Sequence, residues 1–148
     1  NVKILIAEDN EINLLLAKKI LAKMFPKALI YEARNGKQAV EIYKSIPLDI
    51  ILMDIFLNNS RSGIEISKRI NEISNTPIIY MSAFCDDEIL SQAAKTEPFG
   101  YLVKPFNRND LKSILNMVTY KLQKKSANNY LAEGKFKISD DYYYSLDD

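Results

Sequence analysis

Five side chains that can do chemistry stand where apolar segments of the sequence end. They are Glu8, Asp9, Asp54, Ser82 and Lys104. Each has an ordinary alternative role, because Asp and Ser often cap a following helix and lysine before proline is a common loop residue. Carboxylates, a hydroxyl and a lysine together are also the groups that phosphoryl transfer uses. What decides between these readings is whether the fold brings the five together.

Apolar runs alternate with segments of helical spacing along the first 124 residues. The predicted strands are 2–7, 28–33, 49–54, 77–82 and 99–103, and the predicted helices are 10–25, 35–46, 64–73, 86–95 and 107–124. This alternation predicts an α/β fold in which helices cover both faces of a parallel sheet. The expected architecture is a flavodoxin-like (βα)5 doubly wound sheet with strand order 2-1-3-4-5, whose binding crevice lies beside strands one and three.

Strands one and three end in acidic residues. Three carboxylates about 5 Å apart, from Glu8, Asp9 and Asp54, repel one another by roughly 3 kcal/mol per pair at an effective dielectric constant near 20. Lys104 supplies one compensating charge. Oxygen ligands in a chain without histidine favour Mg²⁺ as the remaining cation. Asp54, at the end of the central strand, is the expected nucleophile, and its product would be an acyl phosphate.

Composition narrows the other possibilities. The net charge of +1 gives no reason to expect nucleic acid or a membrane as an electrostatic partner. The single cysteine, Cys85, cannot form an internal disulfide and is expected to be a small buried hydrophobe, so a reducing, cytoplasmic location is predicted. The absence of histidine excludes Ser-His-Asp and HExxH chemistry. The four glycines stand too far apart for a phosphate-binding loop.

Residues 2 to about 124 resemble the response-regulator receiver domains of two-component signalling. The segment "ILIAEDN" matches the acidic pair of that family, and "ILMDI" matches its phospho-acceptor strand. The segment "MSA" matches its hydroxyl position, and "GYLVKPF" matches its lysine with the proline that follows. The loop "IFLNNSRSG" departs from the family pattern, because it lacks the usual proline and the usual aspartate before glycine.

The resemblance implies that Asp54 accepts a phosphoryl group from a sensor histidine kinase or a phosphotransfer protein. It implies that Mg²⁺ is held by Asp9, Asp54 and the backbone carbonyl of Phe56, with Glu8 acting mostly through water. Lys104 would be a catalytic residue. We expect no turnover of an external substrate.

The resemblance also implies a conformational switch, in which Ser82 moves toward the phosphoryl group and Tyr101 turns inward. Phe56 and Phe84 would flank the approach of water and offer it no hydrogen bond, so slow self-dephosphorylation is expected. A homodimer formed on phosphorylation is a further expectation.

The receiver domain is predicted to span residues 1–125, and residues 126–148 to form a linker or the start of an effector domain. The tail "FKISDDYYYSLDD" could pair as a hairpin. It resembles, more weakly, the first strands of a winged-helix DNA-binding domain, and contact with DNA would need an effector domain absent from this chain. An extension without an effector role is the alternative. The expected output is control of transcription.

Three other functions compete with this interpretation. A Mg²⁺-dependent phosphohydrolase similar to the haloacid dehalogenases would need a second aspartate at the position of Phe56. A phosphorylation-independent receiver would usually have lost the acidic pair or the lysine, and both are present. A stand-alone receiver acting as a phosphorelay or protein-binding module stays open.

Overall fold

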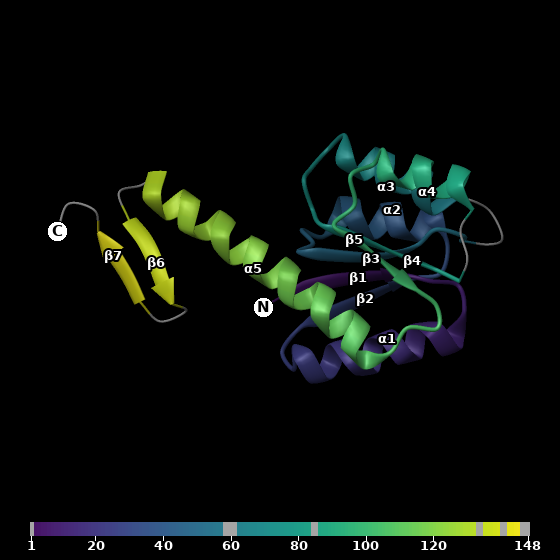
Figure 1. Ribbon diagram of the computed structural model, residues 1–148, viewed down its shortest axis with the longest axis horizontal. Coiled ribbons are helices and arrows are strands. Elements are labelled where there is room, and N and C mark those ends of the chain that lie inside the picture. Colours follow the sequence, from purple (N-terminus) through teal and green to yellow (C-terminus); the bar gives the residue numbers. More distant parts are fainter. Residues whose placement is uncertain (1, 58–61, 84–85, 133–134, 140–141, 146–148) are drawn as a thin grey trace. The chain divides into compact units, whose positions relative to one another are not determined.

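The computed structural model describes residues 2–57, 62–83, 86–132, 135–139 and 142–145, with side chains described as far as residue 124 (Figure 1). The chain divides into two compact units, Asn1–Lys112 and Ser113–Asp148. Cys85, Phe84 and residues 58–61 lie outside the described residues, so the expectations placed on them stay predictions. Within the described residues, no helix is long and apolar enough to cross a membrane.

The first unit is built on a five-stranded parallel sheet with strand order β2-β1-β3-β4-β5. Its strands are β1 (Lys3–Ala7), β2 (Leu29–Ala33), β3 (Ile50–Asp54), β4 (Ile78–Ser82) and β5 (Gly100–Val103). The predicted flavodoxin-like order is therefore confirmed.

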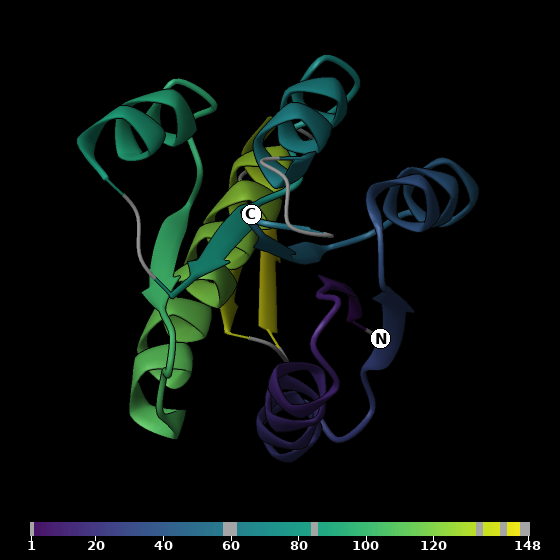
Figure 2. The same ribbon diagram turned by 90° about the vertical axis from the view of Figure 1, so that its right-hand side faces the viewer.

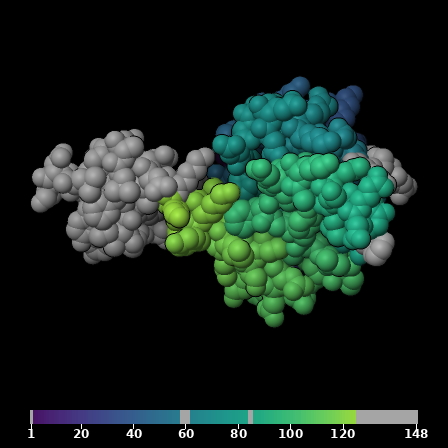
Figure 3. Space-filling view, turned by 45° about the horizontal axis from the view of Figure 1, so that its top comes forward, coloured from purple at the N-terminus to yellow at the C-terminus, as the bar shows by residue number. Residues whose placement is uncertain are grey.

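The helices that follow these strands are α1 (Glu11–Met24), α2 (Gly36–Ser45), α3 (Ser62–Asn71), α4 (Asp87–Ala94) and α5 (Arg108–Ala132). Asn10 caps α1, because its side chain accepts hydrogen bonds from the backbone N–H groups of Ile12 and Asn13, each at 3.0 Å. The helices α2, α3 and α4 lie on one face of the sheet and α1 lies on the other (Figure 2). The same order runs over the surface, from blue α2 through teal α3 to the green of α4 and β5 (Figure 3).

The central strand β3 is buried along its whole length. Ile51 and Met53 belong to the core cluster on the side of α2 and α3. Ile50 and Leu52 are equally buried, and because strand side chains alternate they face the opposite layer. Burial on both faces explains why this strand is a continuous apolar run rather than an alternating one.

The helix α5 is longer than the sequence predicts. We expected an end near residue 124, where basic residues suit a helix C-terminus. The structure continues the helix to Ala132. Between Pro105 and Gly134 the sequence contains no proline or glycine, so no strong helix breaker interrupts it.

The tail forms the predicted hairpin in the second unit. Strands β6 (Lys135–Ser139) and β7 (Tyr142–Ser145) pair antiparallel, with a register irregularity between Lys137 and Ser139. The hairpin is compatible with either interpretation of the tail, so the winged-helix resemblance and the boundary near residue 125 stay predictions.

A buried polar network joins β4 to the end of α4. The Thr96 hydroxyl donates to the carbonyl of Ala93 at 2.6 Å, so the Tyr80 hydroxyl donates to Thr96 Oγ1 at 2.7 Å. Asn71, at the end of α3, donates to the carbonyl of Thr96 at 2.6 Å. The ring of Tyr80 in turn lies 5.8 Å from the ring of Tyr101 on β5. These contacts hold the end of α4 against the strands that carry Tyr80 and Tyr101.

Replacing Thr96 by valine should lower the free energy of unfolding by about 1–2 kcal/mol, because the buried hydroxyl of Tyr80 loses its Thr96 partner. The matched control is Ser45→Ala, which removes an exposed hydroxyl that donates to the carbonyl of Glu41. Urea denaturation of the two variants and wild type measures the difference. Equal stabilities for all three proteins would contradict the prediction.

Candidate functional site

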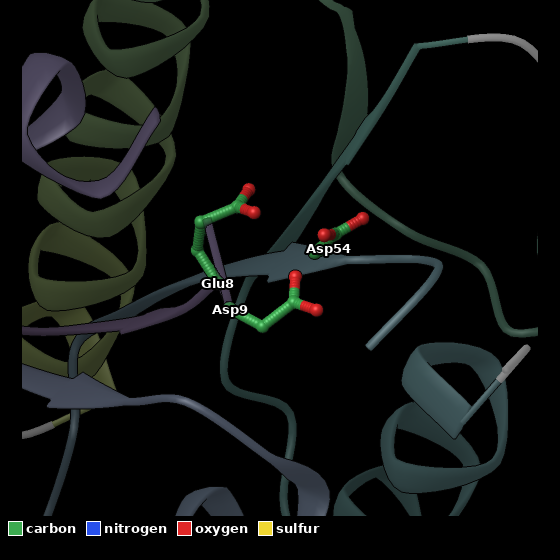
Figure 4. Close-up of side chains that lie close together, drawn as sticks. All are labelled: Glu8, Asp9 and Asp54. Carbon is green, nitrogen blue, oxygen red and sulfur yellow. The ribbon is translucent and has the colours of Figure 1, made fainter. Parts of the chain in front are cut away.

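The acidic residues converge at the carboxyl ends of two neighbouring strands. Glu8 and Asp9 follow β1, and Asp54 is the last residue of β3. The two strands pair in parallel with Ala7 opposite Met53, which brings their ends to the same edge of the sheet. The three side chains each offer an oxygen, and these oxygens lie within 4.8 Å of one another (Figure 4). The predicted spacing of the carboxylates is confirmed.

Lys104 crosses from the end of β5 to this cluster. Its ammonium nitrogen lies 2.5 Å from Glu8 Oε2 and 3.2 Å from Asp54 Oδ2. Its backbone N–H donates to the carbonyl of Ser82 at 2.8 Å. This bond holds the main chain of Lys104 beside the end of β4. One ammonium group thus faces two buried carboxylates.

Asp54 is 4% exposed. Burial, followed by the negative charge of Glu8, raises the pKa of the Asp54 carboxyl from 3.8 to about 7. The Lys104 ammonium opposes this increase, as does the backbone N–H of Phe56, which donates to Asp54 Oδ1 at 3.0 Å. Desolvation and repulsion together exceed these attractive contacts, so the site without a further cation disfavours the ionised form of Asp54.

One oxygen of the Glu8 carboxylate accepts a hydrogen bond, and the other has an ionic partner only. Its Oε1 atom accepts a hydrogen bond from the backbone N–H of Asn10 at 3.1 Å. Its Oε2 atom is buried and has the Lys104 charge beside it, but it accepts no hydrogen bond from the described residues. An incompletely satisfied carboxylate within an oxygen-only donor set fits a hard divalent cation.

The two predicted switch residues occupy different environments. Ser82 is the last residue of β4 and is 7% exposed, so it ends its strand at the same edge of the sheet as the acidic residues. Tyr101 is 37% exposed, and its ring lies against Tyr80. The structure therefore brings Glu8, Asp9, Asp54 and Lys104 together, joins Ser82 to them through the backbone of Lys104, and leaves Tyr101 partly exposed.

The sequence did not predict the polar network that lies behind Tyr101. Tyr80 looked like one more residue of a buried strand, and Thr96 and Asn71 carried no motif. Asn71 and Thr96 are 25 residues apart, and Tyr80 and Thr96 are 16 apart, so only the tertiary fold brings them together. The one available signal was a tyrosine in an otherwise aliphatic strand, because a buried tyrosine hydroxyl usually has a hydrogen-bond partner.

Comparison with known proteins agrees with this geometry. Residues 4–116 match the response regulator receiver domain family. The chain is 35% identical over 107 residues to "Chemotaxis protein CheY" of Halobacterium salinarum, an alignment that covers 72% of this chain and 87% of that protein. It is 33% identical over 102 residues to "Transcriptional regulatory protein YdfI" of Bacillus subtilis, which covers 69% of this chain and 47% of YdfI. The chain thus spans about half the length of that regulator.

A solved structure gives the same result. The crystal structure of a two-component response regulator from Clostridium difficile superimposes with a TM-score of 0.75 at 25% sequence identity, covering 82% of this chain and 98% of that one. The fold and the site thus define a class of α/β protein. Its members carry an acidic cluster and a lysine at the carboxyl edge of a parallel sheet.

The chain belongs to the response regulator receiver domain family. Such domains act in phosphorylation-dependent two-component signalling, interact with sensor histidine kinases or phosphotransfer partners, and bind Mg²⁺ at an acidic pocket.

The raised pKa of Asp54 predicts how stability depends on pH without metal. Between pH 3.8 and about 7 the unfolded chain has released the Asp54 proton while the folded protein retains it, so the free energy of unfolding falls as the pH rises. Asp54→Asn removes this cost. At neutral pH and without Mg²⁺, the variant should be more stable than wild type by on the order of 2 kcal/mol, and the gain should vanish below pH 3.8.

Urea denaturation in the presence of a chelator, across this pH range, measures the effect. Asp9→Ala is the control, because it removes a charge of the same cluster that is exposed, and it should raise the stability less. A gain for Asp54→Asn that does not depend on pH would show that burial of the charge is not the cause.

Proposed function

We propose that this chain is the phosphorylation-controlled switch of a response regulator and that Asp54 is its phospho-acceptor. The observation that carries the proposal is the position of Asp54. Its carboxylate ends the central strand and is buried, and it faces Lys104 at 3.2 Å beside two further carboxylates. A buried carboxylate with a cation beside it suits a nucleophile whose product carries extra negative charge.

The donor set supports Mg²⁺ as the cofactor. Asp9, Asp54 and the backbone carbonyl of Phe56 would hold the ion, and Glu8 would act mostly through water. When bound, the ion supplies positive charge that offsets the charge of the phosphoryl oxygens. Two observations support this assignment: the carboxylate oxygens lie within 4.8 Å of one another, and Glu8 Oε2 accepts no hydrogen bond from the described residues.

The proposed step is an in-line displacement. A carboxylate oxygen of Asp54 forms a bond to phosphorus while the bond from phosphorus to the donor breaks, and its electron pair leaves with the donor. That donor is a phosphohistidine nitrogen in a kinase or phosphotransfer protein, or the acetate oxygen of acetyl phosphate. Lys104 offsets charge on the phosphoryl group, and the Ser82 hydroxyl donates a hydrogen bond to it.

We propose no turnover of an external substrate. The phosphoryl group is transferred to the protein itself and is lost slowly, because Phe56 presents a half-buried ring with no group to bind an attacking water. Phe84, the second residue of this hypothesis, lies outside the described residues.

We propose transcription control as the output and the cytoplasm as the location. The name of the YdfI relative supports an effector domain that follows a receiver. The alternative is a stand-alone relay without DNA-binding output, and the match to 87% of CheY supports it.

Incubation with acetyl phosphate and Mg²⁺ should add the mass of one phosphoryl group, and peptide mapping should place it on Asp54. Asp54→Asn should remove the labelling, because an amide cannot act as the nucleophile. The matched control is Asp49→Asn near the opposite end of β3, where the carboxylate accepts a hydrogen bond from Lys3 N at 2.8 Å. This variant should label like wild type. Full labelling of Asp54→Asn would refute the assignment.

Ser82→Ala tests the proposed switch. The variant should still accept phosphate on Asp54, because the hydroxyl is not the nucleophile. It should couple phosphorylation poorly to Tyr101 and to α4, since the hydroxyl that would follow the phosphoryl group is absent. Amide NMR spectra before and after phosphorylation measure the coupling. Shifts on α4 and β5 as large as those of wild type would exclude Ser82 from the switch.

A further inference from the structure

The first turn of α3 approaches the main chain of β3 closely at Asp54, the proposed phospho-acceptor. Gly63 is buried in the first turn of α3. A Cβ atom added to it would lie 2.1 Å from the carbonyl oxygen of Asp54, 2.9 Å from its carbonyl carbon and 2.9 Å from the Cα of Ile55. All three are main-chain atoms, so no rotation of a side chain could relieve the overlap. Glycine is therefore the residue that allows the helix to approach this closely.

The strand on which Gly63 rests cannot move aside easily. β3 is paired on both edges, with β1 on one side and β4 on the other. The pairing continues just beyond the acceptor, where Ile55 N donates to the carbonyl of Met81 at 3.0 Å. A larger residue at position 63 would therefore displace the first turn of α3 rather than the strand.

The first turn of α3 is also joined to the residues that follow Asp54. Gly63 N donates to the carbonyl of Ile55 at 3.1 Å, and the Ser62 hydroxyl donates to the carbonyl of Leu57 at 3.3 Å. Ser67, buried on the same helix, donates its hydroxyl to the carbonyl of Gly63 at 2.9 Å. The residues on either side of Phe56 are thus both held by the start of α3.

We propose that Gly63 is a positioning residue for the site, which sets the direction of the Phe56 carbonyl and of the Asp54 carboxylate by letting α3 rest on the Asp54 peptide group. This inference depends on the proposed function, in which both groups bind Mg²⁺. Phe56 links the two, because its N–H donates to Asp54 Oδ1 and its carbonyl is the proposed ligand. A shift of the first turn would move the main chain on both sides of the Phe56 Cα and so misplace both oxygens.

The chain offers a matched control in Gly36, at the first turn of α2. A Cβ atom there would lie 2.6 Å from Cδ1 and 3.4 Å from Cγ1 of Ile66. These are the outer atoms of a side chain of α3 and not main-chain atoms, so the overlap is with a side chain alone. Gly63→Ala and Gly36→Ala therefore add the same methyl group to the start of a helix, against main chain in one case and against a side chain in the other.

The test uses the full chain and two readouts that do not depend on phosphorylation. Calorimetric titration with MgCl₂ measures the affinity for the metal, and amide hydrogen exchange of metal-free protein measures the protection of Phe56 N–H. Gly63→Ala should weaken Mg²⁺ binding by roughly tenfold, as is usual when the support of a metal ligand is disturbed. It should also speed exchange at Phe56. Gly36→Ala should bind Mg²⁺ like wild type.

A folded Gly63→Ala protein with wild-type Mg²⁺ affinity and wild-type protection of Phe56 would overturn the proposal, even if its stability were lower. If Gly63→Ala does not fold, Ser62→Ala decides, because it removes the contact to Leu57 without adding volume. It should weaken Mg²⁺ binding and speed exchange at Phe56, and no change in either would refute the inference. Wild-type protein that binds no Mg²⁺ would overturn the proposed function as well.

Discussion

The burial of two carboxylates beside one ammonium group is the constraint on which the rest of this site depends. Glu8 and Asp54 are almost fully buried, and Lys104 is their shared cation. Such an arrangement is unfavourable by itself, because each ion loses hydration and the two anions repel. The fold offsets the cost with a sheet whose central strand is buried on both faces. The stability of the apolar layers is thus what allows buried and poorly compensated carboxylates to persist.

The same layout connects the site to the surface. Ser82 ends β4 at the acidic edge, and two residues earlier on the same side of that strand Tyr80 contacts Tyr101 and is hydrogen-bonded to Thr96. A rearrangement at Ser82 therefore has a short route to a half-exposed aromatic residue and to the end of α4. The route runs through close-packed groups, which have few intermediate arrangements available.

Much of the fold and of the candidate site could be predicted because their signals are local. The run from Ile50 to Met53 indicates a strand buried on both faces, and parallel strands necessarily bring their carboxyl ends to one edge. What could not be predicted depends on the tertiary fold. The pKa of Asp54 follows from burial and from Glu8, the partners of Thr96 come from distant segments, and the close approach at Gly63 exists only once α3 is packed. The predicted end of α5 was wrong for a different reason. Basic residues near 124 were taken as the C-terminus of the helix, but no proline or glycine follows there to end it.

The contact between Gly63 and the peptide group of Asp54 limits which substitutions this sequence can accumulate during evolution. Main-chain atoms are the same whatever side chain stands at position 54, so the steric limit on position 63 outlasts any substitution of the aspartate. If the proposed function holds, what disappears with the aspartate is the need for a finely oriented Phe56 carbonyl. In a descendant that has abandoned phosphorylation, a shifted α3 would carry only a packing cost, and selection would tolerate alanine or serine at position 63. Loss of this glycine would then indicate that phosphorylation has been lost, although the glycine itself contacts no ligand.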